Sequence, residues 1–238
     1  MKPRGRPLCG SITRRPFRTC LPTVSSINAR RQALRLVIEQ IRRCLVSSFG
    51  LIAPDDPDRL VDSAPLPVCT YGRAARCRTV SGPEYVGLIA IKKARFFGFR
   101  LQATVSAQQV VDEWLLAPAA RKDGKVVAAL LSNRQDLRVF GDNAYHDPLA
   151  QAALLNHNVR LYALPRRDAR TPWPAACRHW VKHVRVRIET AFSVLQTVFH
   201  LQQPGSRSLA GLITRTASRL LAYTLCFIAA PRFAAGQL

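Results

Sequence analysis

The stretch LRVFGDNAYHDPLAQAALLNHN, residues 137–158, decides the fold class because it joins a strand to a helix through one short turn. Its apolar start predicts a strand that ends at Asp142. Asp147 followed by Pro148 indicates a helix start, with aspartate as the N-cap and proline at the first helical position. VRLYALP, residues 159–165, predicts a second strand. A strand, a helix and a strand in this order indicate an α/β protein.

Segments on either side of this unit extend the same pattern. RLVDSAPLPV, residues 59–68, predicts a short strand that ends near Asp62, where prolines close the segment. Residues 96–118 divide at Ser106–Gln108 into two alternating halves, which predicts an antiparallel hairpin. Helices are predicted for KVVAALLS at 125–132, HVRVRIETAFSVLQTVFHL at 183–201 and SLAGLITRTASRLLAYTLCFIA at 208–229, with a Pro- and Arg-rich connector from Pro165 to about Trp180. The order predicts a mixed sheet with helices packed on it.

The N-terminal part divides into two segments ahead of this α/β unit, which spans residues 56–230. Residues 1–32 are basic and contain no acid, and we expect a disordered leader. A DNA-tracking arm, an Arg-rich organellar transit peptide and a mis-started reading frame remain alternatives. Residues 33–55 form a helical segment, because apolar residues recur at helical spacing on one face of the stretch from Arg31 to Phe49. The predicted apolar face consists of Leu34, Val37, Ile38, Ile41 and Leu45.

Charge and cysteine content limit the function classes. With 36 Lys and Arg against 14 Asp and Glu, the net charge is +22, which favours a polyanionic partner, nucleic acid ahead of an anionic membrane surface. We expect no membrane span, since Arg215 and Arg219 interrupt the apolar segment from Leu209 to Ala230. The seven cysteines form no CxxC pair, and no apolar core follows the basic N-terminus. These features favour free thiols in a reducing compartment, the cytoplasm.

Three isolated carboxylates are the candidate catalytic residues. Asp62 and Asp142 both end apolar strands, and Glu189 lies at the margin of the apolar face of the helix at 183–201. If the three meet at one sheet edge, their mutual repulsion is relieved by divalent cations, and hard oxygen ligands suit Mg²⁺ or Mn²⁺. Two such ions would support displacement at phosphorus. The alternatives are ordinary turn or cap roles for each aspartate and a helical ion pair between Glu189 and Arg185.

The blocks VDSAPLPVC, KKARFFGFRLQ, LLAPA, FGDNAY and RVRIETAFSVL resemble successive blocks of bacterial insertion-sequence transposases of the DDE superfamily. The resemblance covers about residues 34–229 and is nearest to the group named after insertion sequence nine-eighty-two, allied to the insertion-sequence-four-like group. It implies a ribonuclease-H-like fold and DNA strand cleavage and transfer by a homo-oligomer on transposon-end and target DNA. It also implies two Mg²⁺ or Mn²⁺ ions held by Asp62, Asp142 and Glu189.

The family's Tyr-Arg-Glu-Lys signature is matched only in part. Arg185 and Glu189 fit, whereas Lys182 stands at the tyrosine position and Gln196 at the lysine position, where the family contacts DNA. The sequence ahead of Asp62 is also shorter than usual for the family. The candidate DNA-binding residues are Lys182, Arg185, Arg187, Arg166, Arg167 and Gln196. Two alternatives therefore stand beside an active transposase: a truncated or inactive remnant that only binds DNA, and a nuclease that cuts without joining.

CRHWVKH, residues 177–183, offers a further constellation. Cys177, His179 and His183, with Cys69 and Cys77 conceivably near, would have to supply four tightly spaced ligands to bind zinc. A surface of Arg, His and Trp facing DNA is the favoured interpretation of this stretch.

Overall fold

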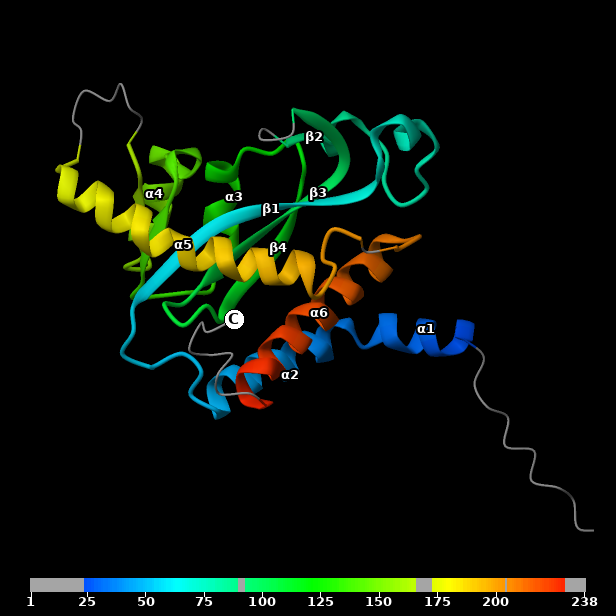
Figure 1. The fold of residues 1–238 in the computed structure, drawn as a ribbon, viewed down its shortest axis with the longest axis horizontal. Helices are drawn as coiled ribbons and strands as arrows, with labels where there is room; N and C mark the ends of the chain where they lie inside the picture. Colours follow the sequence, from blue (N-terminus) through cyan, green and yellow to red (C-terminus); the bar gives the residue numbers. More distant parts are fainter. Residues whose placement is uncertain (1–23, 90–92, 166–172, 204, 230–238) are drawn as a thin grey trace, which may run out of the picture.

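A mixed sheet of six strands forms the centre of the protein (Figure 1). The structure, a computed structural model, describes residues 24–89, 93–165, 173–203 and 205–229. The strands are β1 (Asp58–Thr70), β2 (Val86–Ile89), β3 (Ala94–Val105), β4 (Val111–Pro118), β5 (Arg138–Gly141) and β6 (Arg160–Ala163). Their order is β2-β3-β1-β5-β6, and β4 also pairs with β3. β3 runs antiparallel to its neighbours β1 and β4, whereas β5 and β6 run parallel to β1.

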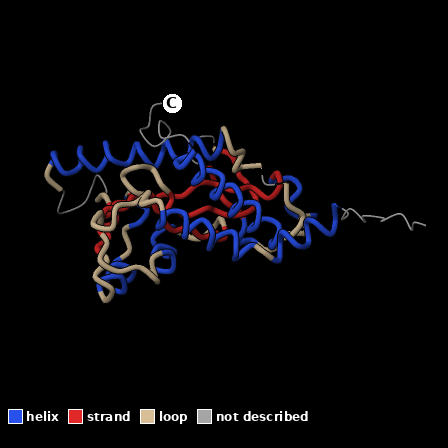
Figure 2. Tube along the Cα trace, turned by 90° about the horizontal axis from the view of Figure 1, so that it is seen from below, coloured by secondary structure: helices blue, strands red, loops and turns tan. Residues whose placement is uncertain are grey.

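Helices cover both faces of this sheet. They are α1 (Val24–Ala33), α2 (Arg35–Ser48), α3 (Asp123–Leu130), α4 (Pro148–Leu155), α5 (Ala175–Thr197) and α6 (Leu209–Ala229). One core joins α5 and α6 to β1 and β3 through residues such as Leu101, Ile188 and Leu220. A second core joins α3 and α4 to the other face through Val61, Val127 and Leu154. Figure 2 shows the strands between these helical layers. The predicted α/β class, with a mixed sheet flanked by helices, is confirmed.

The strand-helix-strand unit that begins at β5 folds as its sequence predicts. Asp147 caps α4 by accepting hydrogen bonds from the backbone N–H groups of Leu149 and Ala150, and Pro148 is the first helical residue. The predicted hairpin is formed by β3 and β4. Strand β2 was not predicted. Helix α5 begins at Ala175, whereas the predicted connector extended to about Trp180.

β1 is longer than predicted, because it continues through both prolines to Thr70 and Asp62 lies in its interior. β5 pairs with β1 only from Asp58 to Leu60. Beyond Leu60, therefore, the side of β1 away from β3 has no strand to receive an N–H, and proline is tolerated on such an edge. Pro65 and Pro67 face Arg100 and Gly98 of β3, with an irregularity between Pro67 and Cys69.

The N-terminal segment departs from prediction in two ways. Residues 24–32, assigned above to the disordered leader, are part of helix α1, while residues 1–23 lie outside the described range. Helix α2 is also rotated relative to the predicted apolar face. Leu34, Val37 and Ile41 are about half exposed, whereas Arg42 is completely buried.

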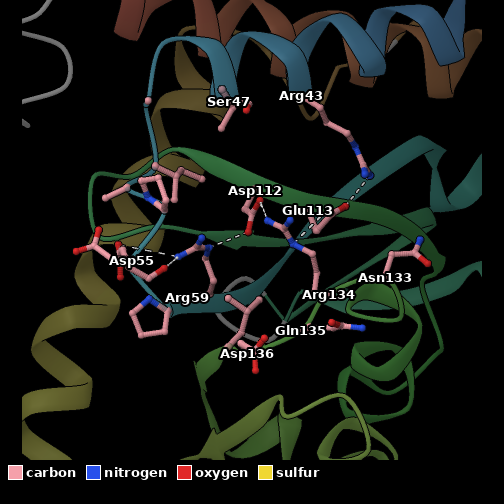
Figure 3. Close-up of a pocket in the computed structure, with 18 of the residues that line it drawn as sticks. Arg43, Ser47, Asp55, Arg59, Asp112, Glu113, Asn133, Arg134, Gln135 and Asp136 are labelled. Carbon is pink, nitrogen blue, oxygen red and sulfur yellow. Dashed lines mark hydrogen bonds and ion pairs between the residues drawn. The ribbon is translucent and has the colours of Figure 1, made fainter.

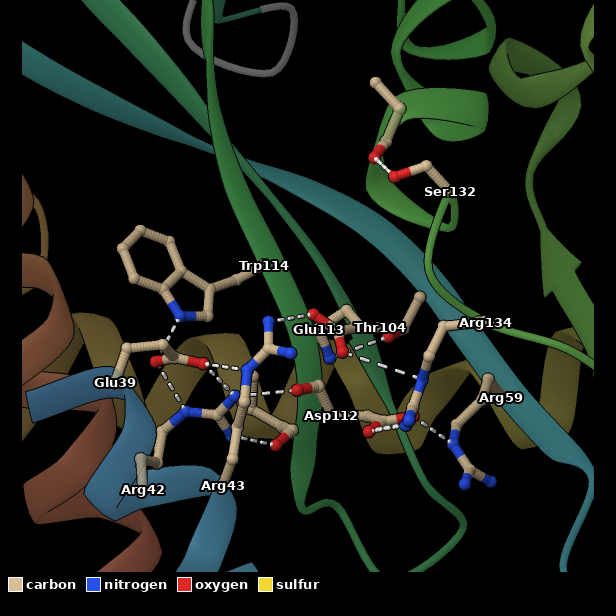
Figure 4. Close-up of polar contacts among 12 residues, drawn as sticks. Glu39, Arg42, Arg43, Arg59, Thr104, Asp112, Glu113, Trp114, Ser132 and Arg134 are labelled. Carbon is tan, nitrogen blue, oxygen red and sulfur yellow. Dashed lines mark hydrogen bonds and ion pairs between the residues drawn. The ribbon is translucent and has the colours of Figure 1, made fainter. Parts of the chain in front are cut away.

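An ion-pair network explains the burial of Arg42. Its guanidinium binds Glu39 at 2.6 and 2.9 Å and donates to the carbonyl oxygens of Val111 (2.5 Å) and Asp112 (2.7 Å) on β4. Trp114 of β4 donates its indole N–H to Glu39, as Figure 4 shows. Because each buried charge has a partner of opposite sign, the network fastens α2 to β4 at tolerable desolvation cost.

The network continues toward the start of β1. Arg59 and Arg134 both bind Asp112, and Arg43 binds Glu113 at 2.7 Å. These side chains line a cavity of about 810 Å³ between α2 and the sheet (Figure 3). The arginines that line this cavity pair with carboxylates. These pairs join α2 to the sheet.

α6 is the one described helix that is long and apolar enough to cross a membrane by length and composition alone. In this fold it packs between the core and α2, with Leu212 and Leu220 fully buried. Arg215 and Arg219 interrupt its apolar sequence, as expected for a helix of the core.

Candidate active site

Asp62 lies on the part of β1 that α5 crosses. Its main chain pairs with Ala103 of β3, and its carboxylate accepts a hydrogen bond from the N–H of Ser63 at 2.8 Å. Arg185 of α5 donates to the other carboxylate oxygen at 3.2 Å. The Asp62 side chain is only 21% exposed, so its ion pair with Arg185 is largely shielded from solvent.

Asp142 follows β5 directly, at the carboxyl end of a strand parallel to β1. It caps the short turn Asn143–Tyr145 by accepting a hydrogen bond from the N–H of Ala144 at 2.9 Å. Gly141 makes this turn possible, because a Cβ there would lie 2.9 Å from both Tyr145 and Val61. The turn role that was an alternative for Asp142 is therefore real, and it leaves the second carboxylate oxygen available.

The negative charge of Asp142 acts on Asp62. The pKa of Asp62 is raised to about 6, mainly by burial and in part by the charge of Asp142, while Ser63 and Arg185 act in the opposite direction. A buried carboxylate with a raised pKa and a second acid nearby is a candidate functional residue. The structure thus brings Asp62 and Asp142 within electrostatic reach of each other.

A third acid, Asp123, belongs to the same region from the other face of the sheet. As the first residue of α3, it accepts hydrogen bonds from Gln102 of β3 and from Ser63 Oγ (3.2 Å). Burial raises the pKa of Asp123, and Asp142 raises it as well. Tyr145, completely buried, donates its hydroxyl to Gln102 at 2.6 Å. This chain of bonds holds β1, β3 and the turn after Asp142 together.

Asp123 was not among the candidate residues chosen from the sequence, and it lies just ahead of the helix predicted at 125–132. Its contact with Ser63 depends on the pairing of Ser63 with Gln102 across β1 and β3. Side chains alternate along a strand, so Ser63 must face away from Asp62, toward the other side of the sheet. This alternation could have indicated that a polar partner such as Asp123 lies on that side.

Glu189 is on α5, exposed, and makes no hydrogen bond or ion pair with either aspartate among the described residues. Its predicted helical ion pair with Arg185 is not formed, because Arg185 turns to Asp62 instead. Glu189 lies one turn after Arg185, a rise of about 6 Å, on the same side of the helix. Within the described ranges no group of three or more His, Cys, Asp and Glu is close enough to hold a metal ion, and this covers the zinc candidates there as well.

The predicted DNA-binding residues differ in exposure and in the element that carries them. Lys182 and Arg187 are exposed on α5, and Arg187 donates to the carbonyl of Ala107 at 3.0 Å. Gln196 is half-buried near the end of the same helix. Arg166 and Arg167 lie outside the described residues.

The carboxylates present suit a hard divalent cation. Asp62 and Asp142 offer oxygen donors of the kind that Mg²⁺ and Mn²⁺ prefer, and the raised pKa of Asp62, due mainly to burial and in part to Asp142, means that a bound cation would favour its ionised form. Glu189 would need to move toward Asp62 to complete the set.

The mixed sheet thus places one aspartate inside β1 and another directly after β5, the parallel strand beside it. The chain belongs to the DDE transposase family: the family model described as "Transposase DDE domain" matches residues 56–209. That span contains Asp62, Asp142 and Glu189. The assignment to a particular insertion-sequence group stays a prediction.

Two further comparisons provide less support for the family. A search of curated proteins finds no match. Among solved structures, the chain is similar to one titled "Mos1 transposase paired-end complex with left transposon end", with 11% identity and a TM-score of 0.28. The alignment covers 85% of this chain and 67% of that chain. The family assignment rests on the family model and the strand order, not on this low score.

Proposed function

We propose that this transposase cuts DNA at the ends of a bacterial insertion sequence and joins the freed strand to target DNA, with Asp62, Asp142 and Glu189 as its catalytic carboxylates. The observation that carries the proposal is that Asp62 and Asp142, on neighbouring parallel strands beneath α5, lie close enough for the charge of Asp142 to act on Asp62. Bound divalent ions would supply charge stabilisation at phosphorus and a more acidic water. The reaction belongs in the bacterial cytoplasm, by a homo-oligomer assembled on the DNA.

Arg185 has a positioning role in this scheme. It holds Asp62 through one Nη atom, and its Nε is buried without a hydrogen-bond partner among the described residues. An unsatisfied guanidinium donor is costly when buried, and a phosphate oxygen would satisfy it. Lys182 and Arg187, exposed on the same helix, would contact neighbouring phosphates of the DNA strand.

In this proposal Glu189 completes the set when α5 moves toward Asp62. Arg185 already contacts Asp62, and Glu189 stands one turn further along the same side. When a phosphate takes up the charge of Arg185, Asp62 loses its cationic partner, and the glutamate and the two aspartates can then share divalent ions.

The proposal is tested by Glu189→Gln, with Glu84→Gln as the matched control, because Glu84 is also an exposed glutamate but lies away from the site. We expect Glu189→Gln to lower Mg²⁺-dependent cleavage of a transposon-end duplex by at least about 100-fold, the scale on which removing one stabilising group acts. DNA affinity should be unchanged in both variants. Equal cleavage by Glu189→Gln and Glu84→Gln would show that the glutamate has been assigned wrongly.

A second candidate function is DNA binding without catalysis. Two observations favour it: Gln196 replaces the lysine that the family resemblance leads us to expect, and Glu189 is not joined to the aspartates. Wild-type protein that binds DNA in a salt-sensitive way but cuts no transposon end in Mg²⁺ or Mn²⁺ would establish this alternative. Cleavage without strand transfer would instead indicate a nuclease.

A further inference from the structure

Two cysteines at the far end of β1 have thiols that contact each other. Cys69 is the last residue but one of β1, and its main chain pairs with Phe97 of β3. Cys77 follows the short 3-10 turn Tyr71–Arg76 and closes it by donating its N–H to the carbonyl of Ala74 at 3.0 Å. The Cys69 thiol donates a hydrogen bond to the Cys77 sulfur. The pair lies roughly 20 Å along β1 from the candidate active site.

The Cys77 sulfur accepts hydrogen bonds from several donors besides Cys69. They are the backbone N–H groups of Val80 and Thr79 and the hydroxyl of Thr79. Burial acts to raise the pKa of Cys77, but these donors outweigh it, so the pKa lies below its ordinary value. The donors therefore favour the thiolate, which is the nucleophilic form of cysteine.

Cys69 has the opposite environment. Burial raises the pKa of the Cys69 thiol, and the charge of Cys77 and the hydrogen bond to it raise that pKa as well, whereas Arg73 acts in the opposite direction. Both cysteines are free and partly exposed, so a small reagent can reach them. The geometry thus defines Cys77 as the attacking thiol and Cys69 as the resolving thiol beside it.

The surface around the two cysteines is basic. Arg73, Arg76 and Arg78 are all exposed, within the turn or directly after it. The sequence from Ser63 to Pro83 contains no acidic residue. A positive potential raises the local concentration of small anions, so anionic reagents are favoured at this surface.

We propose that Cys69 and Cys77 form a modification site for anionic low-molecular-weight disulfides such as glutathione disulfide, and that the reaction ends in a disulfide between the two cysteines. The Cys77 thiolate attacks one sulfur of the reagent, whose sulfur–sulfur bond breaks, and one small thiolate leaves. Cys69 then releases its proton to solvent and attacks the Cys77 sulfur, which expels the second small thiolate. The two cysteines are oxidised and the reagent is reduced to two thiols. This site does not depend on the proposed function.

The test treats the reduced, folded protein with glutathione disulfide at pH 7 and maps its cysteines by mass spectrometry. Trypsin cleaves after Arg73 and Arg76, so Cys69 and Cys77 fall in separate peptides that only a disulfide joins. We expect this linked pair to form before any disulfide to Cys44 or Cys177, although both of these free cysteines are more exposed. Dithiothreitol should reverse the link. A linked pair that does not form, or forms no sooner than the others, would overturn the proposal.

Single variants separate the attacking thiol from the resolving thiol. Cys69→Ser should retain glutathione on Cys77, because no second thiol displaces it. In Cys77→Ser, Cys69 should react at least about threefold more slowly than Cys77 does in Cys69→Ser, because less of it is thiolate. Cys44→Ser is the matched control and should form the disulfide at the wild-type rate. Equal rates at Cys69 and Cys77 in the two variants would contradict their assigned roles.

Two measurements on the wild type avoid any effect of the substitutions on folding. In urea, Cys77 should lose its rate advantage over Cys44, because the donors from Thr79 and Val80 depend on the fold. A rate advantage that persists in urea would show that the fold does not create the reactivity. Added salt should slow the reaction with glutathione disulfide and speed that with cystamine, a cationic disulfide. The same salt dependence for both reagents would overturn the preference for an anionic disulfide.

Discussion

Replacing Asp62 by asparagine is expected to stabilise the metal-free protein above pH 6 and to leave its stability unchanged near pH 4. The folded protein holds the pKa of Asp62 at about 6, above the ordinary value of 3.8, so the folded state binds this proton more tightly than the unfolded chain. Stability from this group is therefore full below about pH 4 and is lost as the pH rises through 6. Asparagine resembles the protonated acid and carries no charge to lose.

The size of the effect follows from the shift. About two pKa units at 1.36 kcal/mol per unit correspond to about 3 kcal/mol. The carboxylate is 21% exposed, and the variant also removes the acid that pairs with Arg185, so we expect a net gain of about 1–2 kcal/mol at pH 8. For a chain of this size that gain raises Tm by about 3–6 °C.

The assay is thermal unfolding of both proteins at pH 4 and pH 8 in the presence of a chelator. Adding Mg²⁺ at pH 8 should then stabilise the wild type and not Asp62→Asn, because binding to the folded state alone raises stability. A variant that is no more stable than the wild type at pH 8, or a difference of equal size at both pH values, would refute this account of Asp62.

Four other substitutions probe the site and the fold. Asp142→Asn should abolish Mg²⁺-dependent cleavage and leave DNA affinity at fixed salt equal or slightly higher, as measured by nicking and binding assays. Gln196→Lys should steepen the salt dependence of DNA binding and raise strand transfer if the chain has decayed; efficient excision and joining by the unmodified chain would contradict that decay. Arg42→Met should destabilise the protein by about 3–5 kcal/mol in urea unfolding, because Glu39 and two carbonyls lose a buried partner. Arg43→Met, with Arg43 half exposed, should cost less than about 1 kcal/mol, and equal costs would argue against the network.

Local sequence signals predicted the elements that depend on local chemistry. The cap and proline at 147–148 located α4, and the alternating residues around Ser106–Gln108 located the β3–β4 hairpin. The aspartates were found because each stands alone in an apolar context within a basic chain. Their closeness could be inferred from strand order, since β1 and β5 are parallel neighbours.

Features that depend on distant partners could not be predicted. Arg42 is buried because β4 presents carbonyl groups about 70 residues away, and no local pattern places a guanidinium inside an amphipathic helix. The extent of β1 was underestimated for the same reason, because Pro65 is acceptable only when β5 stops pairing at Leu60. The position of Glu189 depends on how α5 packs against the sheet. Helical spacing alone does not determine the position or rotation of α5 on the sheet.

The packing of α2 on α6 has a consequence for synthesis of the chain on the ribosome. α2 is complete at Ser48, whereas α6 ends at Ala229, about 180 residues later, which at roughly 5–20 residues per second is a delay of about 9–36 s. β4 emerges much earlier, by Pro118. The arginine and glutamate contacts of α2 with β4 can therefore form on the nascent chain, and they keep the first long helix in place until the last one arrives to cover it.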